Sequence, residues 1–259
     1  MDCIIVNGEK QSHKNIKLDS GFFFGKGVFE TIHVCEKPIF LEEHLNRINY
    51  GMKVLGINKE VLKEDVLSNI SLLKCKNKAL KIMVSEENTI YSCRDIPYTV
   101  QDYKNGFSLK VSDVKRNPYS NMTYIKSFNY CDNILEREEA LKEGYNEVLF
   151  LNVHDKIAEG SISNIFFIKD NVIYTPKVQC GLLKGIVRDY IISEIEHDGK
   201  FCIEQGEFEL KELYDADGIF LTNSLLGVIK VKRINDVEIK ESAITDYIEF
   251  LYKKSILYK

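Results

Sequence analysis

Residues 123–168 read TYIKSFNYCDNILEREEALKEGYNEVLFLNVHDKIAEGSISNIFFI. Lys126 stands just ahead of an acidic segment with helical character, in which Asp132 is a suitable N-cap and Gly144 a suitable C-terminal stop. Glu159 stands at the end of the next apolar segment, and a Gly-Ser-Ile-Ser-Asn sequence leads from it into another apolar run. The stretch therefore predicts a helix followed by buried strands, with one lysine before the helix and one glutamate between strands.

Patterns on either side of this stretch predict an α+β fold in two domains. Residues 41–57 carry Leu, Ile and Met at helical spacing, so an amphipathic helix is expected there. The polar stretch RNPYSNMTY, residues 116–124, contains one of only four prolines and is the expected linker. We therefore expect a smaller N-terminal domain over residues 1–117 and a larger C-terminal domain over residues 118–259 that carries Lys126, with a cleft between them. Further helices are predicted over residues 59–73, 185–199 and 244–257, and a strand hairpin over 27–40. Strands are predicted over 3–8, 14–19, 79–86, 89–94, 107–115, 147–152, 164–170 and 172–176, and residues 217–231 predict two strands joined by a polar loop.

The composition excludes several classes of protein. Of the 259 residues 44% are hydrophobic and 29% charged, and the net charge of −4 argues against a nucleic-acid or anionic-membrane partner. No apolar run approaches the roughly 20 residues of a membrane span, and the N-terminal sequence does not resemble a signal peptide. The seven cysteines form no CxxC pair, so neither a zinc site nor a disulfide framework is expected, and the pattern fits a reducing cytoplasm.

Lys126 is a candidate nucleophile because of its neighbours. It lies at the predicted domain junction between Ile125 and Phe128, with Tyr124 and Tyr130 nearby. Partial desolvation by such side chains lowers the pKa of an amine and suits it to Schiff-base chemistry. Taken alone, the residue is one lysine among many, and an ordinary surface role is the competing interpretation.

Two further segments are suited to binding a phosphate group. GLLKGIVRD places Gly185 at a helix start, where free backbone N–H groups attract anions, and LTNSLLG places Thr222, Asn223 and Ser224 after a strand. Glu159, held in a turn before a buried strand, could anchor a protonated heteroaromatic nitrogen. A lysine able to form an imine, this glutamate and two phosphate loops together predict a site for pyridoxal 5'-phosphate.

These motifs resemble those of the class IV, or fold-type IV, pyridoxal-phosphate enzymes, which include branched-chain aminotransferases, D-amino-acid aminotransferases and aminodeoxychorismate lyases. The resemblance runs from DSGFFFGKGVFETI through LEEHLNRI and is densest from IKSFNY to GIVRDYII. It implies that Lys126 bonds covalently to the cofactor, that Glu159 pairs with the pyridine nitrogen, and that Arg47 of HLNRI grips the phosphate. The turns Gly185-Ile186-Val187 and Thr222-Asn223-Ser224 correspond to the phosphate-binding turns.

For other positions the sequence leaves more than one role open. Tyr130 is a candidate contact of the phenolic oxygen of the cofactor or a packing residue, and Phe29 and Glu30 either shape the substrate pocket or are strand residues only. Val187 replaces a threonine that is frequent in the family, which removes one hydroxyl contact to phosphate. The arginine-histidine motif of D-amino-acid aminotransferases has no clear match, and Arg94 is the only arginine in that region.

The resemblance implies an enzyme that acts on a small-molecule amine and forms a homodimer. The short chain and the TNSL sequence favour aminodeoxychorismate lyase, which makes the folate precursor 4-aminobenzoate and pyruvate. KSFN is similar to a motif of D-amino-acid aminotransferases, so an aminotransferase for D-amino acids or branched-chain amino acids is the alternative. A binding protein without catalysis is disfavoured because Lys126 and Glu159 are both present.

Overall fold

The computed structural model describes residues 4–11 and 15–257, and contacts divide them into two compact units. Unit 1 holds the described residues up to Pro97 together with Ile125–Tyr130, and unit 2 holds Tyr98–Tyr124 and the described residues from Cys131 onward. The chain therefore crosses between the units at three places, whereas we expected one crossing at residues 117/118. In this division Lys126 belongs to unit 1, because the backbone of its segment pairs with a strand of that unit.

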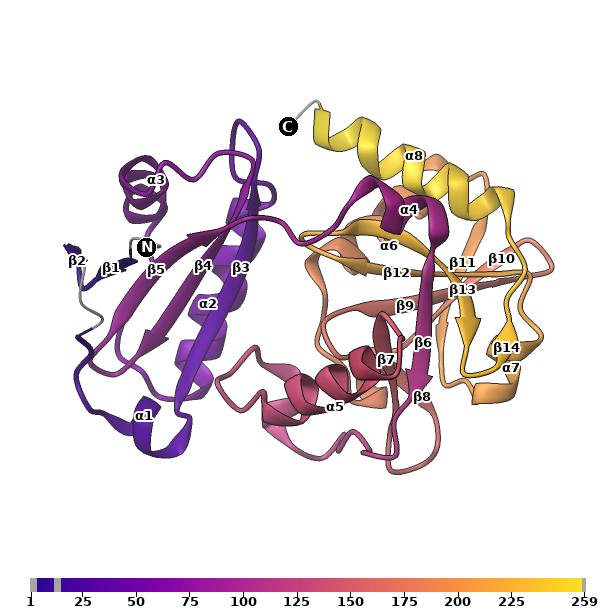
Figure 1. Cartoon of the computed structure of the whole chain (residues 1–259), viewed down its shortest axis with the longest axis horizontal. Coiled ribbons are helices and arrows are strands. Elements are labelled where there is room, and N and C mark those ends of the chain that lie inside the picture. Colours follow the sequence, from indigo (N-terminus) through magenta and orange to yellow (C-terminus); the bar gives the residue numbers. More distant parts are fainter. Residues whose placement is uncertain (1–3, 12–14, 258–259) are drawn as a thin grey trace. The chain divides into compact units, whose positions relative to one another are not determined.

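Unit 1 is an antiparallel sheet with helices packed on it (Figure 1). The strand order is β2-β1-β5-β4-β3. Hydrophobic residues of β3 and β4 that alternate along the strands pack against the apolar side of α2, which makes the core of this unit. Its strands are β1 (Ile4–Val6), β2 (Glu9–Gln11), β3 (Gly27–Val34), β4 (Lys78–Ser85) and β5 (Thr89–Arg94), and its helices are α1 (Ser20–Phe24), α2 (Leu41–Val54) and α3 (Lys63–Leu72).

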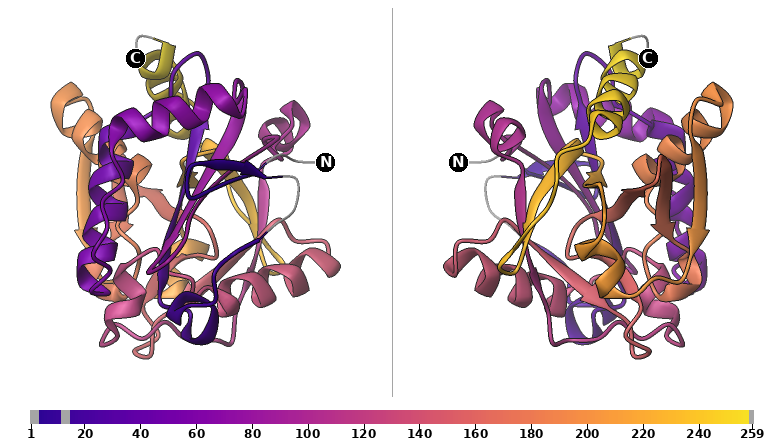
Figure 2. Two further views of the ribbon diagram at one scale, coloured as in Figure 1. Left: turned by 90° about the vertical axis from the view of Figure 1, so that its left-hand side faces the viewer. Right: turned by 90° about the vertical axis from the view of Figure 1, so that its right-hand side faces the viewer.

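Unit 2 contains one large mixed sheet, with the strand order β11-β10-β9-β12-β13-β6-β7-β8 and β14 paired to β13. Helix α5 packs on β7, while α8, drawn in yellow, lies along β12 and β13 (Figures 1 and 2). The strands are β6 (Phe107–Val111), β7 (Glu147–Leu151), β8 (Ile157–Gly160), β9 (Asn164–Lys169), β10 (Val172–Pro176), β11 (Cys202–Gly206), β12 (Gly218–Asn223), β13 (Gly227–Ile234) and β14 (Val237–Glu238). The helices are α4 (Val100–Asn105), α5 (Cys131–Lys142), α6 (Ile186–Asp198), α7 (Leu210–Tyr214) and α8 (Ala243–Leu257), with short 3-10 turns at Asn121–Tyr124 and Val178–Cys180.

The α+β class is confirmed, and so are most of the longer elements. The strand predicted over residues 14–19 is wrong, since described residues 15–19 form no strand, and Cys3 and Lys14 of the predicted N-terminal strands lie outside the described residues. The sequence patterns did not predict α4, α7, β8, β11 and β14, because these elements are short or carry charged residues that obscure periodicity. Within the described part of the chain, no helix is both long and apolar enough to cross a membrane.

The expected linker, residues 116–124, is a structured part of unit 2. Arg116 forms an isolated β-bridge with Asn152, the Tyr124 hydroxyl donates to the Pro118 carbonyl at 2.6 Å, and the Thr123 hydroxyl donates to Asn117 O at 2.8 Å. Strand β6, which precedes it, pairs with β7 and β13 of the same unit. The polar composition of this segment therefore reflects a hydrogen-bonded loop.

Candidate active site

Lys126 is positioned by a short segment that pairs with β3. The Phe29 N–H donates to the Lys126 carbonyl at 2.9 Å, and Val28 and Ser127 form a β-bridge. Gly27 makes this approach feasible, because a Cβ there would lie 2.3 Å from the ring of Phe128. The backbone of the lysine is thus fixed although it lies outside the regular strands.

Two aromatic rings surround the Lys126 ammonium group in unit 1. Its Nζ lies 4.5 Å from the ring centroid of Phe29 and 5.0 Å from that of Tyr130. The two rings contact each other edge to face, with centroids 5.1 Å apart. The sequence predicted an aromatic setting, and the rings that supply it are Phe29 and Tyr130, while Tyr124 belongs to unit 2. Contact with ring faces keeps the amine near apolar surface and still stabilises its protonated form.

A buried charged cluster lies on the opposite face of β3, which is the face toward α2. Glu30 accepts hydrogen bonds from Arg47 Nε at 2.6 Å and Nη2 at 2.8 Å, and His44 Nδ1 lies 2.7 Å from its Oε2. His44 and Arg47 are three residues apart on α2, so both side chains reach the same carboxylate. Arg47, which the resemblance assigns to the phosphate, is oriented by this bidentate pair.

The charge states of this cluster follow from its burial. Burial alone would raise the pKa of Glu30, but the charge of Arg47 and the hydrogen bonds from Arg47 and His44 hold it well below its ordinary value. Burial lowers the pKa of His44 against the opposing effect of Glu30, and the positive charges of Arg47 and Lys126 lower it further. The imidazole is therefore neutral near pH 7, and its Nε2 is buried with no hydrogen-bond partner among the described residues.

Glu159 lies in unit 2 on β8, a four-residue strand that the sequence did not reveal, and its side chain is largely buried. The Arg116 guanidinium contacts Glu159 Oε1 at 3.2 Å, and the Leu183 N–H donates to Oε2 at 3.0 Å. Arg116 also stacks on the Phe150 ring, 4.1 Å from its centroid. The role of Arg116 could not be predicted from the sequence, because nothing in its local pattern distinguishes it from a surface arginine.

Asn164 connects the two predicted phosphate turns. Its Nδ2 donates to the Leu183 carbonyl at 3.0 Å, and a Cβ at Gly185 would lie only 1.8 Å from its Oδ1, so that position excludes any side chain. Asn164 of β9 is also the cross-strand neighbour of Thr222 on β12. The two turns therefore meet at one place in unit 2, which could not be read from their separation in sequence.

The geometry of these turns suits an anion. Gly185 is the N-cap of α6, so the N–H groups of Ile186 and Val187 lie in the first turn, where no intrahelical acceptor exists. Thr222 is 1% exposed, and its Oγ1 has no hydrogen-bond partner among the described residues. Asn223 has a structural role, because its Oδ1 accepts the N–H groups of Leu225 and Leu226, both at 2.9 Å. Ser224 follows it in the same turn.

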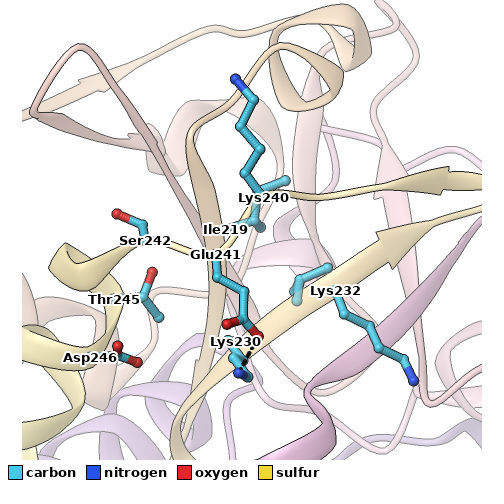
Figure 3. Close-up of a pocket in the computed structure, with 9 residues that line it drawn as sticks. Ile219, Lys230, Lys232, Lys240, Glu241, Ser242, Thr245 and Asp246 are labelled. Atoms are coloured by element: carbon cyan, nitrogen blue, oxygen red, sulfur yellow. Dashed lines mark hydrogen bonds and ion pairs between the residues drawn. The ribbon is translucent and has the colours of Figure 1, made fainter.

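The predicted site residues thus form two groups. Lys126, Arg47, Phe29 and Tyr130 lie in unit 1, and Glu159 and the two phosphate turns lie in unit 2. Arg94, at the exposed end of β5, also lies in unit 1. A small surface pocket of unit 2 contains none of these residues, and the ion pair of Lys230 and Glu241 lies in it (Figure 3). No cluster of three or more potential metal ligands occurs among the described residues.

Comparison with known proteins defines the class. The family model described as amino-transferase class IV matches residues 27–234, and the chain belongs to this family of enzymes. Aminodeoxychorismate lyase of Bacillus subtilis is 31% identical over 278 residues, covering 98% of this chain and 94% of the relative. D-alanine aminotransferase of Staphylococcus epidermidis is 22% identical and covers 94% of this chain and 93% of the relative. The branched-chain amino acid aminotransferase structure of Escherichia coli has a TM-score of 0.87 at 22% identity, with 98% of this chain and 94% of that chain covered.

Proposed function

We propose that this protein is a pyridoxal-phosphate-dependent aminodeoxychorismate lyase that releases pyruvate and 4-aminobenzoate. The observation that carries the proposal is the match to the Bacillus subtilis lyase, which extends over 98% of the chain. The TNSL sequence of residues 222–225 supports the same choice.

The residues present fit the proposed cofactor. In unit 2 the buried hydroxyl of Thr222 has no hydrogen-bond partner among the described residues. Asn164, the cross-strand neighbour of Thr222, donates to the Leu183 carbonyl just before the N-terminus of α6, which offers free N–H groups. These are the donors that a phosphate group requires. In unit 1 the guanidinium of Arg47 is oriented by Glu30, and a guanidinium group can donate two hydrogen bonds to a phosphate. We propose that Arg47 in unit 1 and the donors of unit 2 are phosphate-binding groups.

When bound, pyridoxal phosphate supplies an electron-accepting ring that stabilises negative charge on the carbon next to the substrate amine. With the cofactor bound, the Nζ of Lys126 would be the group that accepts the proton from that carbon. Phe29 and Tyr130 restrict where this amine can move. Glu159 is fixed by Arg116 and by the Leu183 N–H. In the bound cofactor it would keep a proton on the pyridine nitrogen. Glu30 and His44 keep Arg47 in place. A guanidinium fixed in this way would hold the phosphate group of the cofactor in one orientation.

An aminotransferase for D-amino acids or branched-chain amino acids is the second candidate. It is supported by the match to D-alanine aminotransferase over 94% of the chain and by the KSFN sequence of residues 126–129. The same residues would serve, and the reaction would be amino transfer to 2-oxoglutarate in place of the release of pyruvate.

The test is to supply the purified protein, with added cofactor, with aminodeoxychorismate and in parallel with D-alanine or leucine plus 2-oxoglutarate. Formation of 4-aminobenzoate and pyruvate is the expected result, and Lys126→Ala is the control that should form neither. Amino transfer to 2-oxoglutarate without 4-aminobenzoate would reject the lyase in favour of the second candidate.

A further inference from the structure

Two cysteines of unit 1 lie in contact on the inner face of its sheet. Register pairs Cys93 of β5 with the fully buried Leu80 of β4, so Cys93 points toward the core formed with α2 and α3. Lys81 and Ser92, the next pair along these strands, point to the outer face. Cys75 reaches the inner face from the turn after α3, and the Cys93 thiol donates to its Sγ at 2.6 Å.

The main chain holds the two cysteines in this position. The Cys75 N–H donates to the Ile70 carbonyl at 3.0 Å, and Lys74, just before it, has a positive φ of 51°, which ends the helical path of α3. Cys93 belongs to a strand that is paired on both sides, with β4 and with β1. Since the side chains already meet, a bond between the two sulfur atoms requires only a small movement of the main chain.

The two thiols differ in their access to a reagent from solution. Cys75 is 2% exposed, whereas Cys93 is partly exposed. Burial and the hydrogen bond with Cys93 raise the pKa of Cys75 to about 12, so that Cys75 is protonated at pH 7. A reagent therefore meets Cys93 first, and Cys75 is the second thiol that lies beside it.

We propose that Cys75 and Cys93 are a redox-modification site, which closes into a reversible disulfide when a low-molecular-weight disulfide is the oxidant. The Cys93 thiolate attacks one sulfur of this reagent, whose S–S bond breaks, and the departing thiolate takes up the proton that Cys93 has lost. Cys75 then attacks the Cys93 sulfur, and its proton passes to the second departing thiolate. The two protein thiols lose two electrons and two protons, and the reagent is reduced to two thiols. A dithiol reductant reverses both steps.

The bond would stabilise unit 1. The two cysteines are 18 positions apart, and the chain between them is mainly the hairpin of β4 and β5, which is already paired in the folded protein. The bond therefore restricts chiefly the unfolded chain. For a loop of this length we expect the Tm to rise by about 5–10 °C on oxidation.

The experiment equilibrates the full-length protein, with added cofactor, in mixtures of oxidised and reduced glutathione of increasing oxidising strength. The remaining thiols are alkylated, and the disulfides are mapped by mass spectrometry of peptides prepared without reduction. The Tm is measured before oxidation, after oxidation and after treatment with dithiothreitol. Wild type is compared with Cys75→Ala and Cys93→Ser, and Cys202→Ser is the matched control, because Cys202 is an exposed cysteine of unit 2.

Wild type and Cys202→Ser should both give a peptide pair joined through Cys75 and Cys93, with a Tm that rises on oxidation and returns with dithiothreitol. Cys75→Ala should stop at a glutathione adduct on Cys93 without a rise in Tm, and Cys93→Ser should leave Cys75 unmodified. A wild-type protein that carries glutathione on Cys93 but no joined pair would overturn the proposal. So would two thiols that stay free at every glutathione ratio, or a bond from either cysteine to a different one. Because the decisive map is made on the wild type, a variant that fails to fold leaves the test intact.

Discussion

The clearest stability test is Glu30→Gln, because this carboxylate is completely buried between Arg47 and His44. The amide can accept one hydrogen bond from Arg47, but its NH2 group then faces the second N–H of Arg47 or the Nδ1–H of His44. One donor loses its acceptor, and the charge of Arg47 loses its compensation. Removing one partner of a buried ion pair costs about 3–5 kcal/mol, and since Arg47 retains some contact with water we expect about 3 kcal/mol.

The assay is urea unfolding of the wild type and the variant at pH 7. The pKa of Glu30 in the folded protein lies far below its unfolded value, so its stabilising contribution is complete above the unfolded pKa of about 4.3. That contribution is lost as the pH falls from there toward the folded pKa. The difference between wild type and Glu30→Gln should therefore become smaller as the pH falls below about 4.3.

Two further variants test whether Glu30 and Arg47 form a coupled ion pair. Glu86→Gln removes an exposed carboxylate of the same unit that pairs with Lys26, and should have little measurable effect. Glu30→Gln combined with Arg47→Met removes both charges and should regain part of the lost stability. A single variant as stable as wild type at pH 7, or a double variant no more stable than the single one, would show that the cluster is not a coupled ion pair.

The other predictions concern the proposed chemistry. Lys126→Ala should abolish turnover with little change in Tm, and full activity would reject its role. Glu159→Gln should slow turnover on the order of a hundredfold while changing the cofactor Kd much less, and an unchanged rate would show that the pyridine contact is misassigned. Thr222→Val should leave the cofactor-free protein at least as stable, because the hydroxyl has no partner to lose, yet raise the cofactor Kd about tenfold; unchanged affinity would exclude this hydroxyl from the phosphate site. We also expect a homodimer in sedimentation velocity, and an active monomer would contradict this.

Local patterns predicted the parts of the site that depend on neighbours in sequence. Periodicity over residues 41–57 gives the helix that carries Arg47, and the pattern after Gly185 gives helix α6, of which Gly185 is the N-cap. The contact of Lys126 with Tyr130 could also be predicted, since Tyr130 is only four residues away, whereas Phe29 reaches the lysine from the distant strand β3. These features depend on propensity and spacing, which a single sequence contains.

The partners of these residues could not be predicted, because each comes from a distant element. Arg116 reaches Glu159 from across 43 positions of the sequence, and Asn164 joins Leu183 to the strand of Thr222. Glu30 looked like one member of an alternating strand, and only packing of α2 shows that its side chain is buried on a histidine and an arginine. Strand register and helix packing set these contacts, and neither leaves a local signal.

The alternation along β3 separates two kinds of function. Glu30 points to the face that packs on α2, where it fixes Arg47, while Phe29 points to the outer face with Lys126 and Lys81. A change on the inner face alters the ion pair of Glu30 and Arg47. Under the proposed function it should therefore affect stability and cofactor retention for lyase and aminotransferase substrates alike. A change on the outer face leaves that ion pair intact and alters only the groups that a substrate touches. If the lyase assignment is correct, exchange of specificity toward simple amino acids should therefore come from the outer face, beginning with Phe29, which contacts Lys126.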